Sequence, residues 1–196
     1  MKEFLKKIMK FLINILICNF LYKVKFINKE NEEKLDKCII CPNHSNTLEP
    51  TWIYAKTDNL SIMAKAELFK NKFIASIYEY FGVFAIHRGE KDIKSILYSI
   101  NIFKNKDKQK LLIFPEGERI REDRERGTAK DGPAFIAYKA NVPIVPVYIT
   151  KNAKPFSKVN VIYGEPIYIT KDIVDDKEKL KEFSIKLIDI IYGLKR

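Results

Sequence analysis

Residues 38–50 read CIICPNHSNTLEP, and this stretch predicts a buried strand followed by a turn and a helix. Residues 38–41 are apolar and are bounded by Pro42, which is the composition of a short strand in a core. The asparagines and the serine that follow are residues that favour turns. A helix is then expected to begin near Pro50, because proline is tolerated in the first turn of a helix.

His44 and Glu49 are the candidates for acid–base chemistry in this stretch. Residues five apart on one helix would lie on different faces, so we expect the two side chains to meet across the turn. The carboxylate of Glu49 would then hold one ring nitrogen of His44, while the other accepts a proton from a hydroxyl. A lone histidine after a strand is more often an ordinary loop residue, and no serine or cysteine at a nucleophile elbow accompanies it. These residues alone leave both interpretations open.

Three further blocks follow along the chain: residues 82–88 read GVFAIHR, residues 114–119 read FPEGER, and residues 142–147 read VPIVPV. Together with residues 43–50 they resemble, in order, the sequence blocks of the glycerolipid acyltransferases, the family of 1-acyl-glycerol-3-phosphate acyltransferase. The resemblance covers residues 25–170, nearly all of the expected folded part. It implies an enzyme of phospholipid biosynthesis that moves a fatty acyl group from acyl-CoA or acyl carrier protein to the free hydroxyl of 1-acyl-glycerol-3-phosphate, making phosphatidate.

The resemblance assigns the chemistry to the first block. His44 matches the family's general base, and Glu49 stands at the position of the aspartate that orients it in the N-H-x4-D pattern. The acceptor hydroxyl would attack the thioester directly, without an acyl-enzyme intermediate. General-base assistance of this kind contributes about 10²–10⁴-fold. The groups that stabilise the oxyanion are not identified by the sequence.

Five further residues belong to the acceptor site by the same resemblance. Arg88 and Arg119 stand where the family binds the acceptor phosphate, and guanidinium suits this role because its rigid donors engage two phosphate oxygens at once. Glu116 and Gly117 match the family's Glu-Gly pair, which shapes the glycerol site through an acceptor carboxylate and a close backbone approach. Lys130 corresponds to a lysine further along the family's sequence. A single surface arginine is more often a solvated charge, so these assignments depend on the surrounding blocks.

Three departures from the family pattern concern the acceptor. Glu49 replaces the usual aspartate, residues 118–120 read ERI where the family has TRS, and His87 stands where an acidic residue is common. Glu118 places negative charge beside the expected phosphate site. The same chemistry on another lysolipid or an amino-lipid acceptor therefore stays open, as does a non-catalytic lipid-binding homologue.

The composition fits one domain with a full core. The 196 residues are 46% hydrophobic and 31% charged, which is typical of a globular protein. The formal net charge is +11, so anionic partners are expected. Because no nucleic-acid-binding motif is recognisable, lipid headgroups and phosphorylated substrates are favoured over nucleic acid.

The cysteines and histidines argue against a metal centre. Three cysteines and two histidines are too few for a structural zinc site, which needs about four ligands. Cys38 and Cys41 are three apart on the expected strand and would point to opposite faces, which favours two core thiols over a redox pair. We expect a reducing compartment, and no cofactor besides the acyl donor as co-substrate.

Residues 1–22 predict a helix at the membrane surface. The apolar run 11–22 is interrupted by Asn14 and Asn19 and is too short to span a bilayer. Lysines flank it, and no signal-peptide cleavage site is visible. We expect an amphipathic helix in the membrane interface with its lysines on lipid phosphates, attaching the protein peripherally to the cytoplasmic face of the cell membrane. The alternative is a helix packed against the protein's own core.

Residues 23–196 are expected to form a single acyltransferase domain. Strands alternate with helices, which predicts an α/β layered fold with a central, mostly parallel or mixed sheet flanked by helices. Residues 23–37 are expected to be a loop, and the prolines within residues 142–149 predict an edge or irregular strand. The other expected strands are residues 60–64, 82–87 and 111–114, with a hairpin-like pair at 159–163 and 166–169, and the expected helices are residues 67–80, 91–103, 134–140 and 176–194.

Overall fold

The computed structural model describes residues 2–86, 93–120 and 124–195. Its strands are β1 (Lys23–Ile27), β2 (Lys37–Pro42), β3 (Leu60–Lys65), β4 (Val83–Ile86), β5 (Gln109–Leu112), β6 (Ile144–Ile149) and β7 (Lys158–Tyr163). Within the described residues they form one seven-stranded sheet in the order β1-β7-β6-β2-β5-β3-β4. All neighbouring pairs are parallel except β6 and β7, which are antiparallel. The expected α/β fold with a mixed sheet is confirmed.

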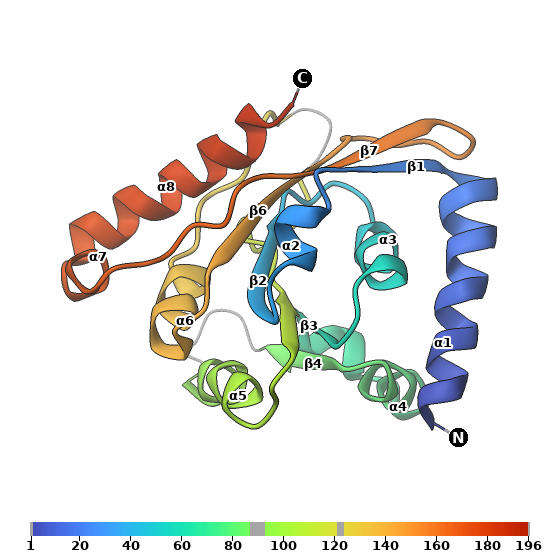
Figure 1. Ribbon diagram of the computed structural model, residues 1–196, viewed down its shortest axis with the longest axis horizontal. Coiled ribbons are helices and arrows are strands. Elements are labelled where there is room, and N and C mark those ends of the chain that lie inside the picture. Colours follow the sequence, from blue (N-terminus) through green and yellow to red (C-terminus); the bar gives the residue numbers. More distant parts are fainter. Residues whose placement is uncertain (1, 87–92, 121–123, 196) are drawn as a thin grey trace.

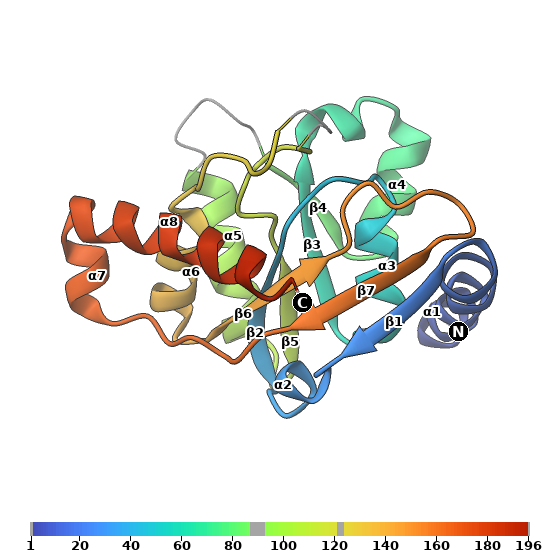
Figure 2. The ribbon, with the colours of Figure 1, turned by 90° about the horizontal axis from the view of Figure 1, so that it is seen from above.

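Helices cover both faces of this sheet (Figures 1 and 2). They are α1 (Lys2–Ile13), the π-helical segment η1 (Asn14–Leu21), α2 (Glu30–Glu33), α3 (Glu49–Lys56), the 3₁₀ turn η2 (Ala66–Phe69), α4 (Lys72–Tyr80), α5 (Ile93–Lys104), α6 (Gly132–Ala140), α7 (Lys171–Asp175) and α8 (Lys177–Gly193). On one face, η1 and α3 bury Cys18 and Trp52 completely. On the other, α5, α6 and α8 bury Phe103, Ile136 and Leu187.

The central strand β2 contributes to both cores. Cys38 and Ile40 pack on the α3 side, whereas Ile39 and Cys41 pack on the α6 and α8 side, and all four are fully buried. Burial raises the pKa of the Cys38 thiol to about 12. The interpretation of Cys38 and Cys41 as two core thiols on opposite faces is therefore confirmed.

Residues 142–149 were expected to form an edge or an irregular strand, and the edge alternative is wrong, because β6 lies between β2 and β7. Pro143 precedes the strand, and its carbonyl accepts from the backbone N–H of Ile39 (2.9 Å). Pro146 faces Gly164, just beyond the end of β7, and its carbonyl accepts from the Gly164 N–H (2.8 Å). Pro143 thus lies just before β6 begins, and Pro146 faces the chain just after β7 has ended. Because few sheet hydrogen bonds are lost at these two positions, the prolines are tolerated in an interior strand.

Two other expectations about the sheet are also wrong. Residues 23–37 contain β1 and α2 rather than a loop, because the sequence KVKFI alternates exposed lysines with apolar residues that face the core. Residues 166–169 do not pair with β7. Instead Ile167 crosses to Ile144 at the start of β6, and the two exchange backbone hydrogen bonds of 2.8 Å.

The helix expected over residues 67–80 is divided into η2 and α4. Asn71 separates the two, and its Oδ1 accepts from the backbone N–H groups of Phe73 (3.0 Å) and Ile74 (3.2 Å). Asparagine is a favourable residue at this capping position because it satisfies the orphan donors of a first helical turn. At the other end of the chain, α7 precedes α8 inside a region expected to be loop and helix.

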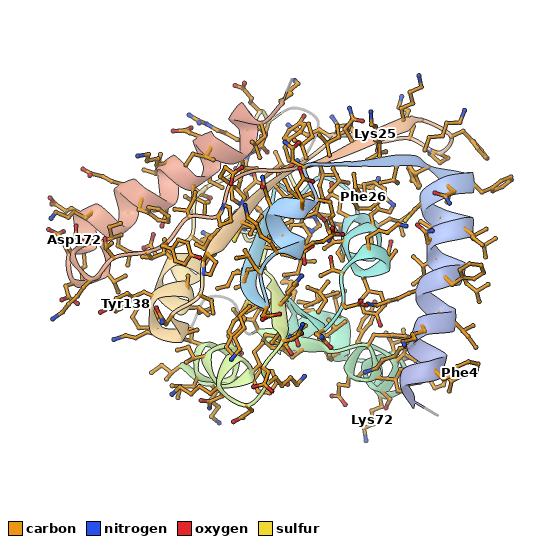
Figure 3. The ribbon with its side chains drawn as sticks, viewed as in Figure 1. Phe4, Lys25, Phe26, Lys72, Tyr138 and Asp172 are labelled. Carbon is orange, nitrogen blue, oxygen red and sulfur yellow. The ribbon has the colours of Figure 1, made fainter. Side chains whose placement is uncertain are left out.

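The helix α1 turns a lysine toward the protein and most of its apolar side chains outward. Lys10 donates to the carbonyl of Thr57 (2.6 Å) and pairs with Asp58 (2.8 Å), both just beyond the end of α3. Phe4 and Phe11 are 67% and 63% exposed, and Figure 3 shows Phe4 pointing away from the protein. The expectation that the lysines lie on lipid phosphates is therefore wrong for Lys10. Among the described residues, no helix is both long and apolar enough to cross a membrane.

Candidate active site

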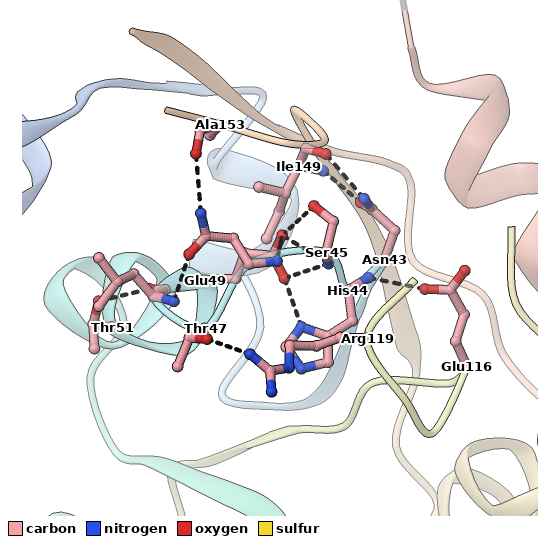
Figure 4. Close-up of polar contacts among 12 residues, drawn as sticks. Asn43, His44, Ser45, Thr47, Glu49, Thr51, Glu116, Arg119, Ile149 and Ala153 are labelled. Carbon is pink, nitrogen blue, oxygen red and sulfur yellow. Dashed lines mark hydrogen bonds and ion pairs between the residues drawn. The ribbon is translucent and has the colours of Figure 1, made fainter. Parts of the chain in front are cut away.

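The loop between β2 and α3 brings His44 and Glu49 together (Figure 4). Glu49 is the first residue of α3 and is completely buried, and His44 follows two residues after the end of β2. Nδ1 of His44 lies 2.6 Å from Oε2 of Glu49, so the two side chains meet across the turn as expected. Because Nδ1 is held by the carboxylate, Nε2 is the ring nitrogen left to accept a proton from a substrate hydroxyl.

Both carboxylate oxygens of Glu49 are held by the turn itself. The Ser45 N–H donates to each oxygen at 3.0 Å, the Ser45 hydroxyl donates at 2.9 Å, and the Asn46 N–H donates at 2.9 Å. A negative carboxylate at the first residue of a helix also complements the orphan N–H groups of that helix end. These hydrogen bonds hold the carboxylate of the longer glutamate side chain within reach of Nδ1 of His44. The sequence blocks led us to expect aspartate at this position.

His44 is fixed on three sides by the segment that follows β5. Its ring stacks on Phe114, with centroids 3.9 Å apart and planes 25° apart. Its backbone N–H donates to Oε2 of Glu116 (2.9 Å), and its carbonyl accepts from the N–H of Ile120 (2.7 Å). The imidazole therefore has little freedom to move relative to residues 114–120.

Asn43 ties the same loop to the neighbouring strand. It is fully buried, its amide nitrogen donates to the carbonyl of Ile149 (3.0 Å), and its Oδ1 accepts from the N–H of Ile149 (2.6 Å). The side chain thus mimics a strand residue and continues the pairing of β2 with β6 past Pro42. The sequence identified Asn43 as a turn former and as part of the first block, but gave it no role.

Glu116 contacts the backbone of His44 rather than its imidazole ring. The residue is fully buried. Besides the His44 N–H on Oε2, its Oε1 accepts from the N–H of Gly127 (2.8 Å) and from the hydroxyl of Tyr192 (2.8 Å). Burial and the neighbouring Glu116 carboxylate raise the pKa of Tyr192, so the phenol stays protonated as a donor. The carboxylate that was expected to accept from a substrate hydroxyl is thus satisfied by three protein donors.

The other described acceptor-site residues gather around the turn after Phe114. Gly117 adopts φ +72°, and a Cβ there would lie 3.3 Å from the side chain of Lys130. The Lys130 N–H donates to the carbonyl of Pro115 (2.9 Å), which holds the lysine beside this turn. Arg119 donates to the Thr47 hydroxyl, which belongs to the same loop as His44 (Figure 4).

Glu118 is paired within its own loop. Its Oε1 lies 2.8 Å from Nη1 of Arg124. This ion pair offsets the negative charge that the sequence places next to Arg119. Arg88 and His87 lie outside the described residues.

Three residues of this site were not expected from the sequence. Phe114 belongs to the third block, and its place just after a strand was the available signal that it would lie near His44. Gly127 belongs to a charged segment, residues 120–131, to which the sequence assigned no strand, helix or site residue except Lys130. Tyr192 is separated from Glu116 by 76 positions along the chain, and no local pattern marks it.

The arrangement suits proton transfer and anion binding. His44 and Glu49 form a base with its orienting carboxylate, and Arg119 and Lys130 add positive charge at the exposed rim. Within residues 2–86, 93–120 and 124–195, no group of three or more His, Cys, Asp or Glu side chains is placed to hold a metal ion.

Comparison with known proteins places this site in a family. A family model described as Acyltransferase matches residues 23–150, which is well over half of the chain. The chain belongs to the acyltransferase family. All seven residues expected at the site from the sequence fall within the matched segment.

Three curated relatives of this acyltransferase carry similar names. A 1-acyl-sn-glycerol-3-phosphate acyltransferase of Bacillus subtilis is 31% identical over 157 residues, covering 74% of each chain. The Streptococcus pneumoniae protein of that name is 30% identical over 157 residues, which are 76% of this chain and 55% of the relative. A probable 1-acyl-sn-glycerol-3-phosphate acyltransferase of Mycoplasma pneumoniae is 32% identical over 146 residues, 68% of this chain and 53% of its own. The acyltransferase thus spans about half the length of two of these relatives.

The fold of this acyltransferase also has a solved counterpart. The crystal structure of the 1-acyl-sn-glycerophosphate (LPA) acyltransferase PlsC from Thermotoga maritima superposes with a TM-score of 0.73 at 21% identity, and the match covers 99% of this chain and 80% of that one. The resemblance that the four sequence blocks suggested is confirmed at the level of the family and of the fold.

Proposed function

We propose that this acyltransferase transfers a fatty acyl group from acyl-CoA or acyl carrier protein to the free hydroxyl of 1-acyl-glycerol-3-phosphate. The observation that carries the proposal is the contact between His44 and Glu49, 2.6 Å from Nδ1 to Oε2, with Arg119 bound to the Thr47 hydroxyl of the same loop. The names of the three curated relatives support the choice of acceptor.

The chemistry follows from the tautomer that Glu49 selects. As the acceptor oxygen attacks the thioester carbonyl carbon, Nε2 of His44 takes the hydroxyl proton. The buried carboxylate of Glu49 stabilises the imidazolium that forms. When the tetrahedral intermediate collapses, the carbon–sulfur bond breaks, the thiolate leaves, and the imidazolium returns its proton to the sulfur. The donor brings an activated thioester, so the proposed reaction uses no further cofactor.

The acceptor phosphate is expected to lie on the positive rim of the site. Arg119 and Lys130 are both exposed; Arg119 is two residues after Gly117, and the Lys130 side chain lies next to Gly117. We keep Arg88 as a third candidate for this anion. Guanidinium and ammonium groups form strong, charge-assisted hydrogen bonds to phosphate oxygens. Since Arg124 pairs with Glu118, the acidic side chain does not cancel this charge.

Attachment to a membrane surface is part of the proposal, because the acceptor is a lipid. On η1, as on α1, aromatic and aliphatic side chains are turned outward, and Phe20 is 69% exposed. On α4, which meets α1 where Lys6 lies over the ring of Tyr80, Phe73 is 75% exposed. Apolar surface of this extent beside lysines suits a helix that lies in the membrane interface. We propose peripheral attachment at the cytoplasmic face, where anionic lipids would also attract a protein with a net charge of +11.

The test is an acceptor and donor matrix with the purified full chain. Labelled acyl-CoA and acyl carrier protein are each offered with 1-acyl-glycerol-3-phosphate, with a choline lysophospholipid, and with monoacylglycerol, which lacks the phosphate. Fast acylation of the phosphate monoester, and slow acylation of monoacylglycerol, is the expected result. A preference for monoacylglycerol would overturn the acceptor assignment. Lipid binding without turnover on any acceptor would instead support the non-catalytic alternative.

A further inference from the structure

A tyrosine of the C-terminal helix lies two hydrogen bonds away from the proposed catalytic base. The hydroxyl of Tyr192 on α8 donates to Oε1 of Glu116 (2.8 Å), and Oε2 of the same carboxylate accepts from the backbone N–H of His44 (2.9 Å). One rigid carboxylate thus connects α8 directly to the residue that carries the imidazole. The proposed reaction gives Tyr192 no part.

The carboxylate of Glu116 depends on its donors because it is fully buried. A buried charge without hydrogen-bond partners is strongly unfavourable, so each donor helps to fix where the group sits. Two of its donors are the backbone N–H groups of His44 and Gly127, and Tyr192 supplies the third. Since backbone donors are set by the path of the chain, Tyr192 is the donor that a substitution can remove cleanly.

Gly127 shows how tightly the carboxylate is enclosed. A Cβ at Gly127 would lie 2.5 Å from Cδ1 of Ile120 and 2.9 Å from Cβ of Glu116. Ile120 is also the residue whose N–H donates to the carbonyl of His44 (2.7 Å). Glu116 and Ile120 therefore hold the N–H and the carbonyl of His44, and both pack closely against Gly127.

Helix α8 is well placed to act as the rigid support. Asp189, one turn before Tyr192, forms an ion pair with Arg126. Nζ of Lys151 donates to the carbonyls of Arg124 (2.8 Å) and Glu125 (2.7 Å). The segment that supplies the Gly127 N–H is thus held to α8 and to the residues after β6. Because burial and Glu116 raise the pKa of Tyr192, its hydroxyl remains a donor across the pH range of an assay.

From this geometry we propose that Tyr192 is a positioning residue for acyl transfer, which acts by holding Glu116 against the backbone of His44. The inference rests on the proposed function for its kinetic consequence. A displacement of about 1 Å in a catalytic group can reduce a rate by roughly a hundredfold. Tyr192 and Glu116 touch no substrate in the proposed reaction, so their loss lowers kcat and leaves the acceptor KM unchanged.

The experiment compares Tyr192→Phe with Tyr138→Phe, which removes a phenol hydroxyl of α6 that is not one of the three donors to Glu116. Tyr192→Phe should lower kcat by about fivefold or more, as expected for a lost hydrogen bond to a buried carboxylate, with the acceptor KM within about twofold of wild type. Exchange of the His44 amide proton, followed by nuclear magnetic resonance, should accelerate by about the same factor. Tyr138→Phe should change neither quantity.

A second variant separates positioning from substrate binding. Glu116→Gln keeps the shape of the side chain but removes its charge, so it should lower kcat with an unchanged acceptor KM. A raised acceptor KM with kcat preserved would show that Glu116 binds the acceptor, and would overturn the proposal. Unchanged kcat and amide exchange in a folded Tyr192→Phe would overturn it as well.

The two readouts also keep the inference apart from the proposed function. If the wild type acylates no acceptor, the proposed reaction fails, and the exchange rate of the His44 amide still decides whether Tyr192 holds this residue. If the wild type is active and Tyr192→Phe matches it in both readouts, the inference alone fails. Should Tyr192→Phe not fold, the kinetic split in Glu116→Gln decides.

Discussion

The turn at His44 and the helix α1 distribute polar and apolar groups in opposite ways. At the turn, the carboxylates of Glu49 and Glu116 are fully buried, and each accepts several hydrogen bonds from the protein. On α1, Phe4 and Phe11 are mostly exposed, while Lys10 is drawn onto the end of α3. The turn satisfies its polar groups internally, whereas α1 leaves an apolar surface uncovered.

This contrast suggests that the two regions have different functions. A preorganised set of buried donors and acceptors is what acid–base catalysis requires, because the groups need not rearrange during the reaction. An uncovered apolar surface contributes nothing to the reaction and gains free energy when another apolar phase covers it. Substitutions at the turn should therefore change rates, and substitutions on the outer face of α1 should change membrane binding. Helix α3 links the two regions, because it begins at Glu49 and Lys10 donates to the carbonyl of Thr57 just past its other end.

Replacing the base should have the largest effect. In His44→Ala, acyl transfer should fall by about 10²–10⁴-fold, because general-base assistance is lost. The fold should persist, since the imidazole is partly exposed and its main packing contact is the ring of Phe114. Single-turnover acylation and vesicle sedimentation measure the two properties in one preparation. Wild-type turnover in His44→Ala would remove the base assignment, and a loss of vesicle binding would break the separation of the two regions.

Removing the charge of the orienting carboxylate should come second. Glu49→Gln keeps the length of the side chain but places a donor amide among groups that donate to it, so kcat should fall by roughly a hundredfold. The matched variant Glu49→Asp keeps the charge and should retain more activity than Glu49→Gln. An equal loss in both variants would mean that the reach of the glutamate matters as much as its charge. Steady-state kinetics on all three proteins decides this.

The turn was predictable because its signals are local. Residues 38–50 contain the strand, the turn formers and the helix start within thirteen positions, so the meeting of His44 with Glu49 followed from their spacing. The distant partners were not predictable in this way. Tyr192 approaches Glu116 across 76 positions, and the enclosed position of Gly127 depends on the final packing of Ile120.

The incorrect predictions about the fold have a similar cause. The lysine-rich residues of β1 looked like a loop because an edge strand can alternate charged and apolar side chains. The prolines near β6 suggested an edge, but Pro143 lies just before β6 begins and Pro146 faces Gly164, just beyond the end of β7. On α1 the apolar pattern was read correctly, yet the sequence could not show that Lys10 would cap the end of α3 rather than face lipid.

Replacing Arg119 tests whether this residue binds the acceptor phosphate or acts in the chemical step. Arg119→Ala removes a guanidinium that contacts the Thr47 hydroxyl beside His44. The acceptor kcat/KM should fall by roughly tenfold to a hundredfold, which is the value of a hydrogen bond to a charged group. The KM for the acyl donor should stay near the wild-type value, and so should turnover of an acceptor without a phosphate. If phosphate-bearing and phosphate-free acceptors lost activity equally, Arg119 would act on the imidazole rather than on the phosphate.

The apolar face of α1 should give the smallest of these effects, because it is divided among many side chains. Phe11 is 63% exposed, and burying such a ring in a bilayer interface contributes about 1–2 kcal/mol, so Phe11→Ser should weaken vesicle binding by roughly tenfold. Ile185→Ser, on the exposed side of α8, is the matched control, since it also replaces an exposed apolar residue by serine and should leave binding unchanged. The melting temperature of Phe11→Ser should equal that of the wild type, because the ring is exposed to solvent and does not pack against the core. Transfer to an acceptor dispersed in detergent should also be unchanged. A drop in that detergent activity together with vesicle binding would show that α1 acts on the site through α3, and the two regions would then have to be treated as one.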